Sequence, residues 1–529
     1  MTESKEVVVL NGNDLSLNDI VAIGNGKKQV ALDKGSLQKC LASREFLLNQ
    51  IKEGKVVYGV NSSYGSMCNK IINDEAMELL QENLIRTHAA GLGEPLHHTV
   101  ALAAVAVRLN SLIKGYSGVR VELLELMREM INNQIAPYIP TRGSVGASGD
   151  LIHLAHLALM LIGEGRVYYK GQLMKAEEAF RLANLKPIKL GAKEGISLIN
   201  GTSVMTAIGA FAVYYAKQAL AVESIAAALA IEIFNSIDDF LEDKLHQLKP
   251  HLGQIKIAKI LKNLVAGSRN VVNRSALHQA IREESNNESA VFETSIFIQN
   301  VYSIRCTPQV LAPVYEAIET AEKIIVLEAN STNDNPVIIP EENKILHGGN
   351  FHGQSIGFYM DSLAIALATL SNLSERRLNT LIDDHLNGEL PEFLICGIKG
   401  LDMGFMGAQY LATSTTAENR QLSNPVSTNN ISSNASNQDV VSMGTVAARK
   451  VFTQVTNLKY ILTMEILADL QAMSFKDSSK LGTEIAKHYQ KLASHFKVYD
   501  STTVFHDMLV KFMDLIFDQD ILDLKKIFQ

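Results

Sequence analysis

The chain has 529 residues, of which 47% are hydrophobic and 20% are charged. This composition excludes a disordered protein, and the length exceeds what one ordinary hydrophobic core needs, so two or more substructures are expected. The net charge of −7 gives no electrostatic basis for a nucleic-acid partner.

The N-terminal segment "MTESKEVVVLNGNDLSLNDI" has no basic stretch followed by an apolar core, so no secretory signal is expected. The most apolar region, residues 203–234, carries Lys217, Glu223 and Glu232, and these charges favour a buried helix over a membrane span. The four cysteines show neither CxxC pairing nor the spacing of metal ligands, which favours free thiols in a reducing compartment. We therefore expect a cytoplasmic protein without a membrane partner.

In chain order, the first expected elements are short strands at "KEVVVL" (5–10) and "KKQVAL" (27–32), which Gly/Asn turns separate. From about residue 74 the apolar spacing becomes helical. Helices are predicted within "NDEAMELLQENLIRTHAAGLG" (73–93), "TVALAAVAVRLNSLIKG" (99–115) and "GVRVELLELMREMINN" (118–133).

Long helices with many small residues and few charges are predicted further on, over 203–236, 306–330, 354–380, 403–420 and 437–473. The polar stretch 424–439 is expected to be a loop between two of them, and a loop of that size is usually functional or disordered. The predicted fold class is mainly α. A smaller N-terminal α+β domain (1–200) is followed by a bundle of long helices (201–529).

The stretch "IPTRGSVGASGDLIHLAHL" (139–157) places glycines and serines directly before a helical pattern. It fits neither the dinucleotide fingerprint, nor the phosphate loop, nor the nucleophile elbow. One interpretation is a helix cap in which Ser148 or Asp150 binds the first free amides. The other is backbone cyclisation: the Gly149 nitrogen attacks the Ala147 carbonyl carbon with loss of water, and loss of a second water from Ser148 leaves an electrophilic methylene.

Eight further motifs follow the same order as in a known family, between about residues 50 and 475. They are "YGVNSSYG" (58–65), "THAAGLG" (87–93), "LINGTS" (198–203), "YSIRCTPQV" (302–310), "NDNP" (333–336), "GGNFHG" (348–353), "SERR" (374–377) and "NQDVVSMG" (437–444). With "GSVGASGDL", they make the chain resemble the aromatic amino acid ammonia-lyases and aminomutases. The resemblance implies a carbon–nitrogen lyase with an ammonia-lyase/fumarase-like fold. It also implies a 4-methylideneimidazole-5-one (MIO) group formed autocatalytically from Ala147, Ser148 and Gly149, with no external cofactor.

The same resemblance assigns roles to further residues. Tyr58 matches the base that takes the β-proton, and positive charge or helix dipoles must lower its pKa from about 10. Arg305 matches the partner of the substrate carboxylate, for which its guanidinium fork is suited. The remaining matches are a second tyrosine near the prosthetic group, two polar positioning residues and an aromatic packing residue: Tyr302, Gln299, Asn200 and Phe351.

His153 and His156 lie at i and i+3 on the predicted helix after the tripeptide. No HExxH motif or third ligand accompanies them, so no metal is expected and a structural use is favoured.

Family members select their substrate at the two residues before "AAG", here Thr87 and His88. A histidine there can bind a phenol or an imidazole, and Gln438 stands where histidine lyases carry Glu. The pair predicts elimination of ammonia from L-tyrosine to give p-coumarate. The alternatives are a histidine ammonia-lyase forming urocanate, a tyrosine 2,3-aminomutase, and a non-catalytic helical scaffold. The aminomutase is favoured by Ser62-Ser63, which replaces the family's Thr-Gly and stiffens the lid loop.

Finally, the resemblance implies a homotetramer of dihedral symmetry in which each site takes residues from three subunits. The apolar helices at 203–236 and 437–473 fit a large obligate interface.

Overall fold

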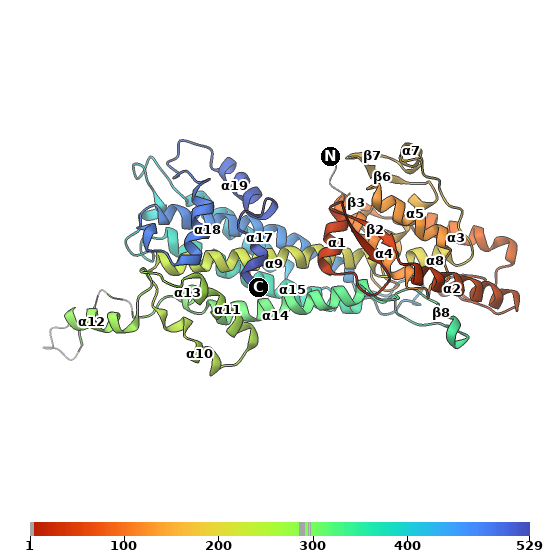
Figure 1. Cartoon of the computed structure of the whole chain (residues 1–529), viewed down its shortest axis with the longest axis horizontal. Coiled ribbons are helices and arrows are strands. Elements are labelled where there is room, and N and C mark those ends of the chain that lie inside the picture. The colour runs from red at the N-terminus through yellow and green to blue at the C-terminus, as the bar shows by residue number, and fades with distance from the viewer. Residues whose placement is uncertain (1–4, 285–290, 295, 297, 529) are drawn as a thin grey trace. The chain divides into compact units, whose positions relative to one another are not determined.

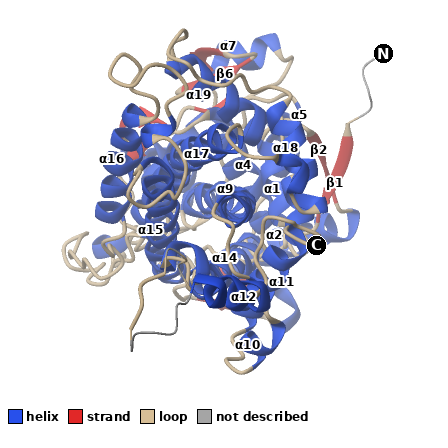
Figure 2. Ribbon diagram, turned by 90° about the vertical axis from the view of Figure 1, so that its left-hand side faces the viewer, coloured by secondary structure: helices blue, strands red, loops and turns tan. Residues whose placement is uncertain are grey.

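The computed structural model describes residues 5–284, 291–294, 296 and 298–528. It is mainly helical, with 59% helix and 8% strand, which confirms the predicted fold class (Figure 2). The chain forms two compact units. Unit 1 comprises Met1–Tyr214, Thr320–Ser362 and Pro425–Phe452, and unit 2 comprises Tyr215–Glu319, Leu363–Asn424 and Thr453–Gln529. The predicted division at residue 200 stays a prediction.

Four long helices each contribute residues to both units: α9 (Ser203–Ile233), α14 (Thr307–Ala329), α15 (Gln354–Ile382) and α17 (Gly444–Met473). The sequence predicted all four, with one clear difference in bounds. Helix α17 begins at Gly444 and not at 437, because residues 437–443 are not helical and Met443 has a φ of +52° that no α-helix accommodates. By length and composition α15 could cross a membrane, but 67% of its most apolar stretch is buried inside the protein.

All the strands found in the described residues lie in unit 1 (Figure 1). The predicted strands β1 (Glu6–Leu10) and β2 (Lys28–Leu32) form a parallel pair in which Glu6 faces Lys28 and Leu10 faces Leu32. The others are β3 (Leu92–Pro95), β4 (Ala136–Pro137), β5 (Pro140–Arg142), β6 (Arg166–Tyr169), β7 (Gln172–Lys175), β8 (Val337–Ile339) and β9 (Lys344–Leu346). They pair as β3–β5, β4–β6–β7 and β8–β9.

The shorter helices of unit 1 are α1 (Leu17–Gly24), α2 (Lys34–Lys52), α3 (Met77–His88), α4 (His98–Ile113), α5 (Val121–Asn132), α6 (Leu151–Leu161), α7 (Ala176–Leu182) and α8 (Glu194–Ile199). Helices α3, α4 and α5 confirm the three predicted within 73–133. Helix α4 is apolar on nearly every face and buried from Val100 to Ile113, as expected of a helix packed on all sides.

Helices confined to unit 2 are α10 (Asp243–Gln247), α11 (Leu252–Leu264), α12 (Arg274–Glu284), α13 (Tyr302–Arg305), α16 (Met406–Leu422), α18 (Thr483–Ala493) and α19 (Phe505–Met513). Within this unit α9, α15 and α17 meet at a buried ion cluster. Arg377 donates to Glu223 at 2.6 Å and to Glu465 at 2.5 Å, and all three side chains are fully buried. Asp469 lies one turn beyond Glu465, and burial next to that carboxylate raises its pKa well above the ordinary value.

Candidate active site

Unit 1 contains a cavity of about 940 Å³ lined by loops and helix ends. Nine of the predicted site residues line it: Tyr58, Thr87, His88, Ala147, Ser148, Gly149, Asn200, Phe351 and Gln438. They come from segments as far apart in the chain as residues 58 and 438, and an enclosure of this size suits a small-molecule site.

The tripeptide Ala147-Ser148-Gly149 forms part of the cavity wall, directly before α6. Gly149 has a φ of +69°, and a Cβ atom there would lie 1.9 Å from the carbonyl oxygen of Gly201. Only glycine is tolerated at such a position, both for its backbone angles and for space. The Asp150 N–H donates to the same Gly201 oxygen at 2.7 Å, so the two chain segments are held in close contact.

Two amide side chains hold Ser148 within this wall. Gln438 Nε2 donates to Ser148 Oγ at 2.9 Å, and Asn200 Nδ2 donates to the Ser148 carbonyl oxygen at 3.2 Å. The Asn200 Oδ1 atom is buried and has no hydrogen-bond partner among the described residues. The serine is thus bonded at its hydroxyl and at its carbonyl by residues that line the same cavity.

Asp150 anchors the cavity wall, whereas the sequence suggested that it could cap α6. Its side chain makes no cap bond to α6. Instead, Oδ2 accepts the N–H groups of Val204 at 3.0 Å and Met205 at 2.8 Å, which lie at the start of α9. Its other oxygen accepts the hydroxyls of Ser144 and Thr445. Complete burial raises the pKa of this carboxyl to about 6 against the effect of these bonds.

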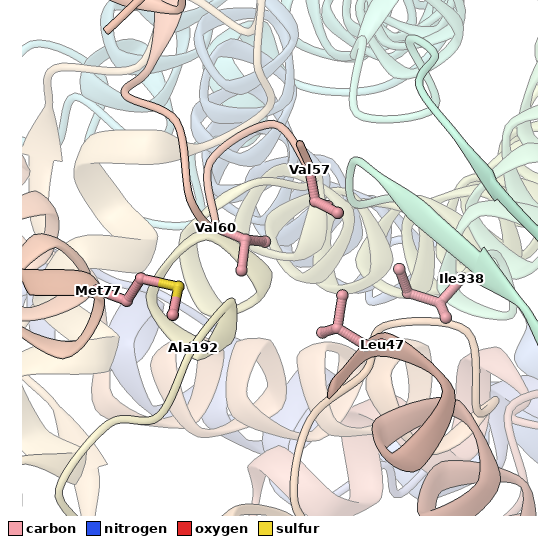
Figure 3. Packing of buried hydrophobic residues seen from close by; sticks show 6 residues of the cluster. All are labelled: Leu47, Val57, Val60, Met77, Ala192 and Ile338. Atoms are coloured by element: carbon pink, nitrogen blue, oxygen red, sulfur yellow. The ribbon is translucent and has the colours of Figure 1, made fainter. Parts of the chain in front are cut away.

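Tyr58 is carried by a loop fixed at its base by apolar side chains. Val57 and Val60 belong to a buried cluster with Leu47, Met77, Ala192 and Ile338 (Figure 3). The phenol oxygen of Tyr58 accepts the backbone N–H of Gly65 at 2.8 Å, and the backbone N–H of Tyr58 donates to His347 Nε2 at 3.3 Å. Burial raises the pKa of Tyr58 above 10, whereas the Gly65 N–H acts to lower it.

Thr87 and His88 end helix α3 at the rim of the cavity. His88 Nδ1 lies 2.9 Å from the carbonyl oxygen of Leu84. A carbonyl can only accept, so Nδ1 carries the proton and Nε2 of the neutral ring is an acceptor. The Thr87 hydroxyl is bonded within its own helix, because it donates to the Asn83 carbonyl at 2.7 Å.

The three remaining predicted residues, Gln299, Tyr302 and Arg305, lie in unit 2 and do not line this cavity. Tyr302 is 69% exposed, and the Arg305 guanidinium lies 4.5 Å from the centre of its ring. Arg305 Nε donates to the Asn300 carbonyl. No lysine or arginine is found among the described residues that line the cavity, so unit 1 offers a carboxylate no cationic side chain there.

The histidines of α6 are buried or half-buried. Burial lowers the pKa of His153 and of His156 to about 4, so both are neutral at pH 7. His156 Nε2 accepts the Gly91 N–H at 3.1 Å, a structural use.

Several cavity residues were not singled out from the sequence. Ser433, Asn434, Asp439 and His352 line the cavity, and the first three belong to the polar loop whose size alone had suggested a function. His352 and Asp439 lie within the motifs "GGNFHG" and "NQDVVSMG", which gave them no individual role. No local motif marks Ser433 and Asn434, because their position at the cavity depends on segments distant in the chain.

The described residues fit the prosthetic group that the resemblance implies. Gly149 is free of any Cβ where its nitrogen would close a ring on Ala147, and the Ser148 carbonyl oxygen that the ring would retain already accepts a hydrogen bond from Asn200. The unpartnered Asn200 Oδ1 leaves further hydrogen-bonding capacity at the same place.

Comparisons with known proteins assign the class. The family model of aromatic amino acid lyases matches residues 15–494, and the chain belongs to this family. Its members are carbon–nitrogen lyases and aminomutases, and the present chain is an enzyme of the lyase type.

Individual relatives are similar over nearly the whole chain. The histidine ammonia-lyase of Caldanaerobacter subterraneus subsp. tengcongensis is 40% identical over 91% of both chains. The histidine ammonia-lyase of Streptococcus pyogenes is 38% identical over 98% of this chain and 97% of the relative. Among solved structures, the tyrosine aminomutase of Streptomyces globisporus matches with a TM-score of 0.94 at 34% identity, covering 98% of each chain.

These relatives contradict the prediction that the protein is a tyrosine ammonia-lyase forming p-coumarate. That prediction depended on Gln438 as a selector facing the substrate. In the structure both ends of its amide are occupied, since Nε2 donates to Ser148 and Oε1 accepts the Ser433 hydroxyl at 3.0 Å. Gln438 therefore also serves the unprocessed tripeptide and the polar loop, and its residue type alone does not identify the substrate.

Proposed function

We propose that the protein eliminates ammonia from L-histidine to give urocanate. The observation that carries this proposal is the similarity of the chain, at up to 40% identity and over nearly its whole length, to histidine ammonia-lyases. The site is compatible with it, because His88 Nε2 is an acceptor at the cavity rim and a substrate imidazole N–H is a matching donor.

The prosthetic group forms, in this proposal, from Ala147-Ser148-Gly149 with loss of two waters. The group held by these residues would supply an electrophile for the substrate amine, which would make the amine a better leaving group. Asn200 donates to the oxygen of Ser148 and so stabilises negative charge there, and Gln438 fixes the Ser148 side chain before cyclisation.

Tyr58 takes the β-proton. Its hydroxyl must be ionised to do so, and the Gly65 N–H is the group in unit 1 that favours the phenolate. Because burial outweighs this bond and raises the pKa, further positive charge must reach the cavity when the enzyme is complete.

A second copy of the chain is the proposed source of that charge. Arg305 and Tyr302 lie on α13 of unit 2 and are not among the residues that line the cavity of unit 1. A substrate carboxylate needs a cation, and the described residues that line this cavity include none. We propose a homotetramer in which Gln299, Tyr302 and Arg305 of neighbouring copies complete each site. The enzyme is proposed to act in the cytoplasm, without a metal.

The test is incubation of the purified protein with L-histidine, L-tyrosine and L-phenylalanine in separate reactions, followed by chromatography for the unsaturated acids and for β-amino acids. The control is Ser148→Ala, which cannot lose the second water. Urocanate from histidine, absent in the control, is the expected result. Turnover of either of the other substrates without urocanate would overturn the proposal.

A second candidate is migration of the amino group in place of its release. The observation that favours it is the loop around Ser62, whose buried hydroxyl accepts the Gly59 N–H at 3.2 Å and stiffens the lid next to Tyr58. A stiff lid retains ammonia in the site. A β-amino acid as the main product would identify this reaction.

A further inference from the structure

A turn in the polar loop, residues 433–438, has an unusual backbone. Ser433 and Gln438 pair as an antiparallel bridge, and the Asn437 N–H donates to the Asn434 carbonyl at 3.0 Å. Between them Asn434, Ala435 and Ser436 have φ values of +52°, +50° and +63°. Three successive left-handed residues, none of them glycine, are a strained stretch of backbone. Such strain persists only where surrounding contacts hold it.

One end of this turn contacts the loop that carries Tyr58. The Ser66 hydroxyl donates to Asn434 Oδ1 at 3.4 Å. The Asn434 amide also lies directly against the α-carbon of Gly65, since a Cβ there would come within 2.1 Å of Asn434 Nδ2. Gly65 is the residue whose N–H donates to the Tyr58 phenol oxygen.

The other end of the turn contacts the tripeptide. Gln438 donates from Nε2 to Ser148 Oγ, and the Ser433 hydroxyl holds the opposite end of its amide. The six residues therefore span from the Tyr58 loop to Ser148. All the groups in this chain of contacts belong to unit 1.

We propose that Asn434 is a positioning residue for the reaction: by packing on Gly65 it holds the Gly65 N–H against the Tyr58 oxygen. Gln438, on the same turn, binds the Ser148 hydroxyl before cyclisation, so the turn connects the loop of the base to the tripeptide from which the electrophile forms. The inference rests on the proposed function only in taking Tyr58 as the base. It is independent of which amino acid is the substrate.

The contact is tested with two substitutions at one position. Asn434→Gly keeps the left-handed backbone and removes the amide, whereas Asn434→Asp keeps the shape of the side chain and an acceptor for Ser66. Ser436→Gly is the control, because it removes strain from the same turn at a side chain that does not line the cavity. Hydrogen–deuterium exchange of the peptide covering residues 58–68 is measured on the whole protein without substrate, and kcat and KM are measured on the substrate that is turned over.

For Asn434→Gly we expect exchange in residues 58–68 to rise by about tenfold or more. We also expect kcat to fall by on the order of ten- to a hundredfold with KM changed less than about twofold, because the base is misplaced while the substrate contacts remain. Asn434→Asp should restore both values, and Ser436→Gly should leave both unchanged.

Unchanged exchange in Asn434→Gly would overturn the proposal, as would a rise spread evenly over the chain, which indicates general destabilisation. A Gly65→Ala change adds an independent check. The added Cβ displaces the Asn434 amide, so the loss of kcat that Gly65→Ala causes should be smaller in the Asn434→Gly background. Additive losses of kcat in the two variants would contradict the contact. If histidine is not turned over, the proposed function fails, but the exchange result still decides this inference.

Discussion

The close contact between Gly149 and Gly201 makes a quantitative prediction for Gly149→Ala. A Cβ at residue 149 would lie 1.9 Å from the Gly201 oxygen and 2.2 Å from its carbonyl carbon, so these backbone segments must move apart by roughly 1 Å. The movement breaks the 2.7 Å bond from the Asp150 N–H, and alanine at a φ of +69° adds strain of its own. Together we expect a loss of about 3–5 kcal/mol in the free energy of unfolding.

Gly54→Ala separates the two causes. Gly54 has a φ of +81°, but nothing lies within 4 Å of where its Cβ would be. Its substitution therefore carries the backbone cost alone, about 1 kcal/mol. The midpoint of urea unfolding, at fixed protein concentration, compares the two variants.

Intact mass provides the second measurement for the same pair. Wild type and Gly54→Ala should be lighter than their sequences by two waters, while Gly149→Ala should retain both, because the displaced and hindered nitrogen does not close on Ala147. Equal stability of the two variants, or loss of both waters in Gly149→Ala, would show that the contact with Gly201 does not constrain this position.

Three further predictions concern the interior of unit 2 and the cavity rim. Replacing Arg377 with Met leaves two buried carboxylates without their cation and should cost about 3–5 kcal/mol in urea unfolding; the exposed neighbour Arg376, replaced in the same way, should cost less than about 1 kcal/mol, and similar costs would contradict the buried pairing. Because the folded pKa of Asp469 is raised, the folded protein binds a proton there that the unfolded chain releases, so stability falls as pH rises above the ordinary value of 3.8. Asp469→Asn should reduce the fall of the urea unfolding midpoint between about pH 5 and about pH 9. If the midpoint of this variant falls with pH as steeply as that of the wild type, the Asp469 carboxyl is not the cause of the fall. His88→Phe should lower kcat/KM for L-histidine by about ten- to a hundredfold through loss of the Nε2 acceptor, and an unchanged value in initial-rate assays would remove His88 from substrate recognition.

Local sequence was sufficient for the long helices and for the tripeptide. Helices such as α4 and α9 are specified by apolar and small residues over many consecutive turns, and these patterns act within one segment. The need for glycine at 149 was likewise visible, since the cyclisation chemistry demands an unhindered nitrogen, and the motifs around it sufficed to assign the family.

The tertiary structure decided matters in which distant segments meet. Asp150 precedes α6 in the sequence, yet it caps the start of α9, because the folded chain brings Val204 and Met205 to its carboxylate. Helix α17 begins seven residues later than its composition suggests. There the Met443 N–H bonds to the Val145 carbonyl and the Ser442 hydroxyl bonds to that of Gly146, and these contacts outweigh helical propensity.

The same reason explains the wrong substrate prediction. Residue type at 438 indicated what an isolated amide can bind, but in the fold that amide also bonds Ser433 and, before cyclisation, Ser148, so the residue type alone did not identify the substrate. Sequence alone determined which chemical groups this enzyme possesses and which short stretches become helix. Only the three-dimensional contacts, between residues as far apart as 58 and 438, determined which of those groups line one cavity, because the segments that carry them are distant in the chain.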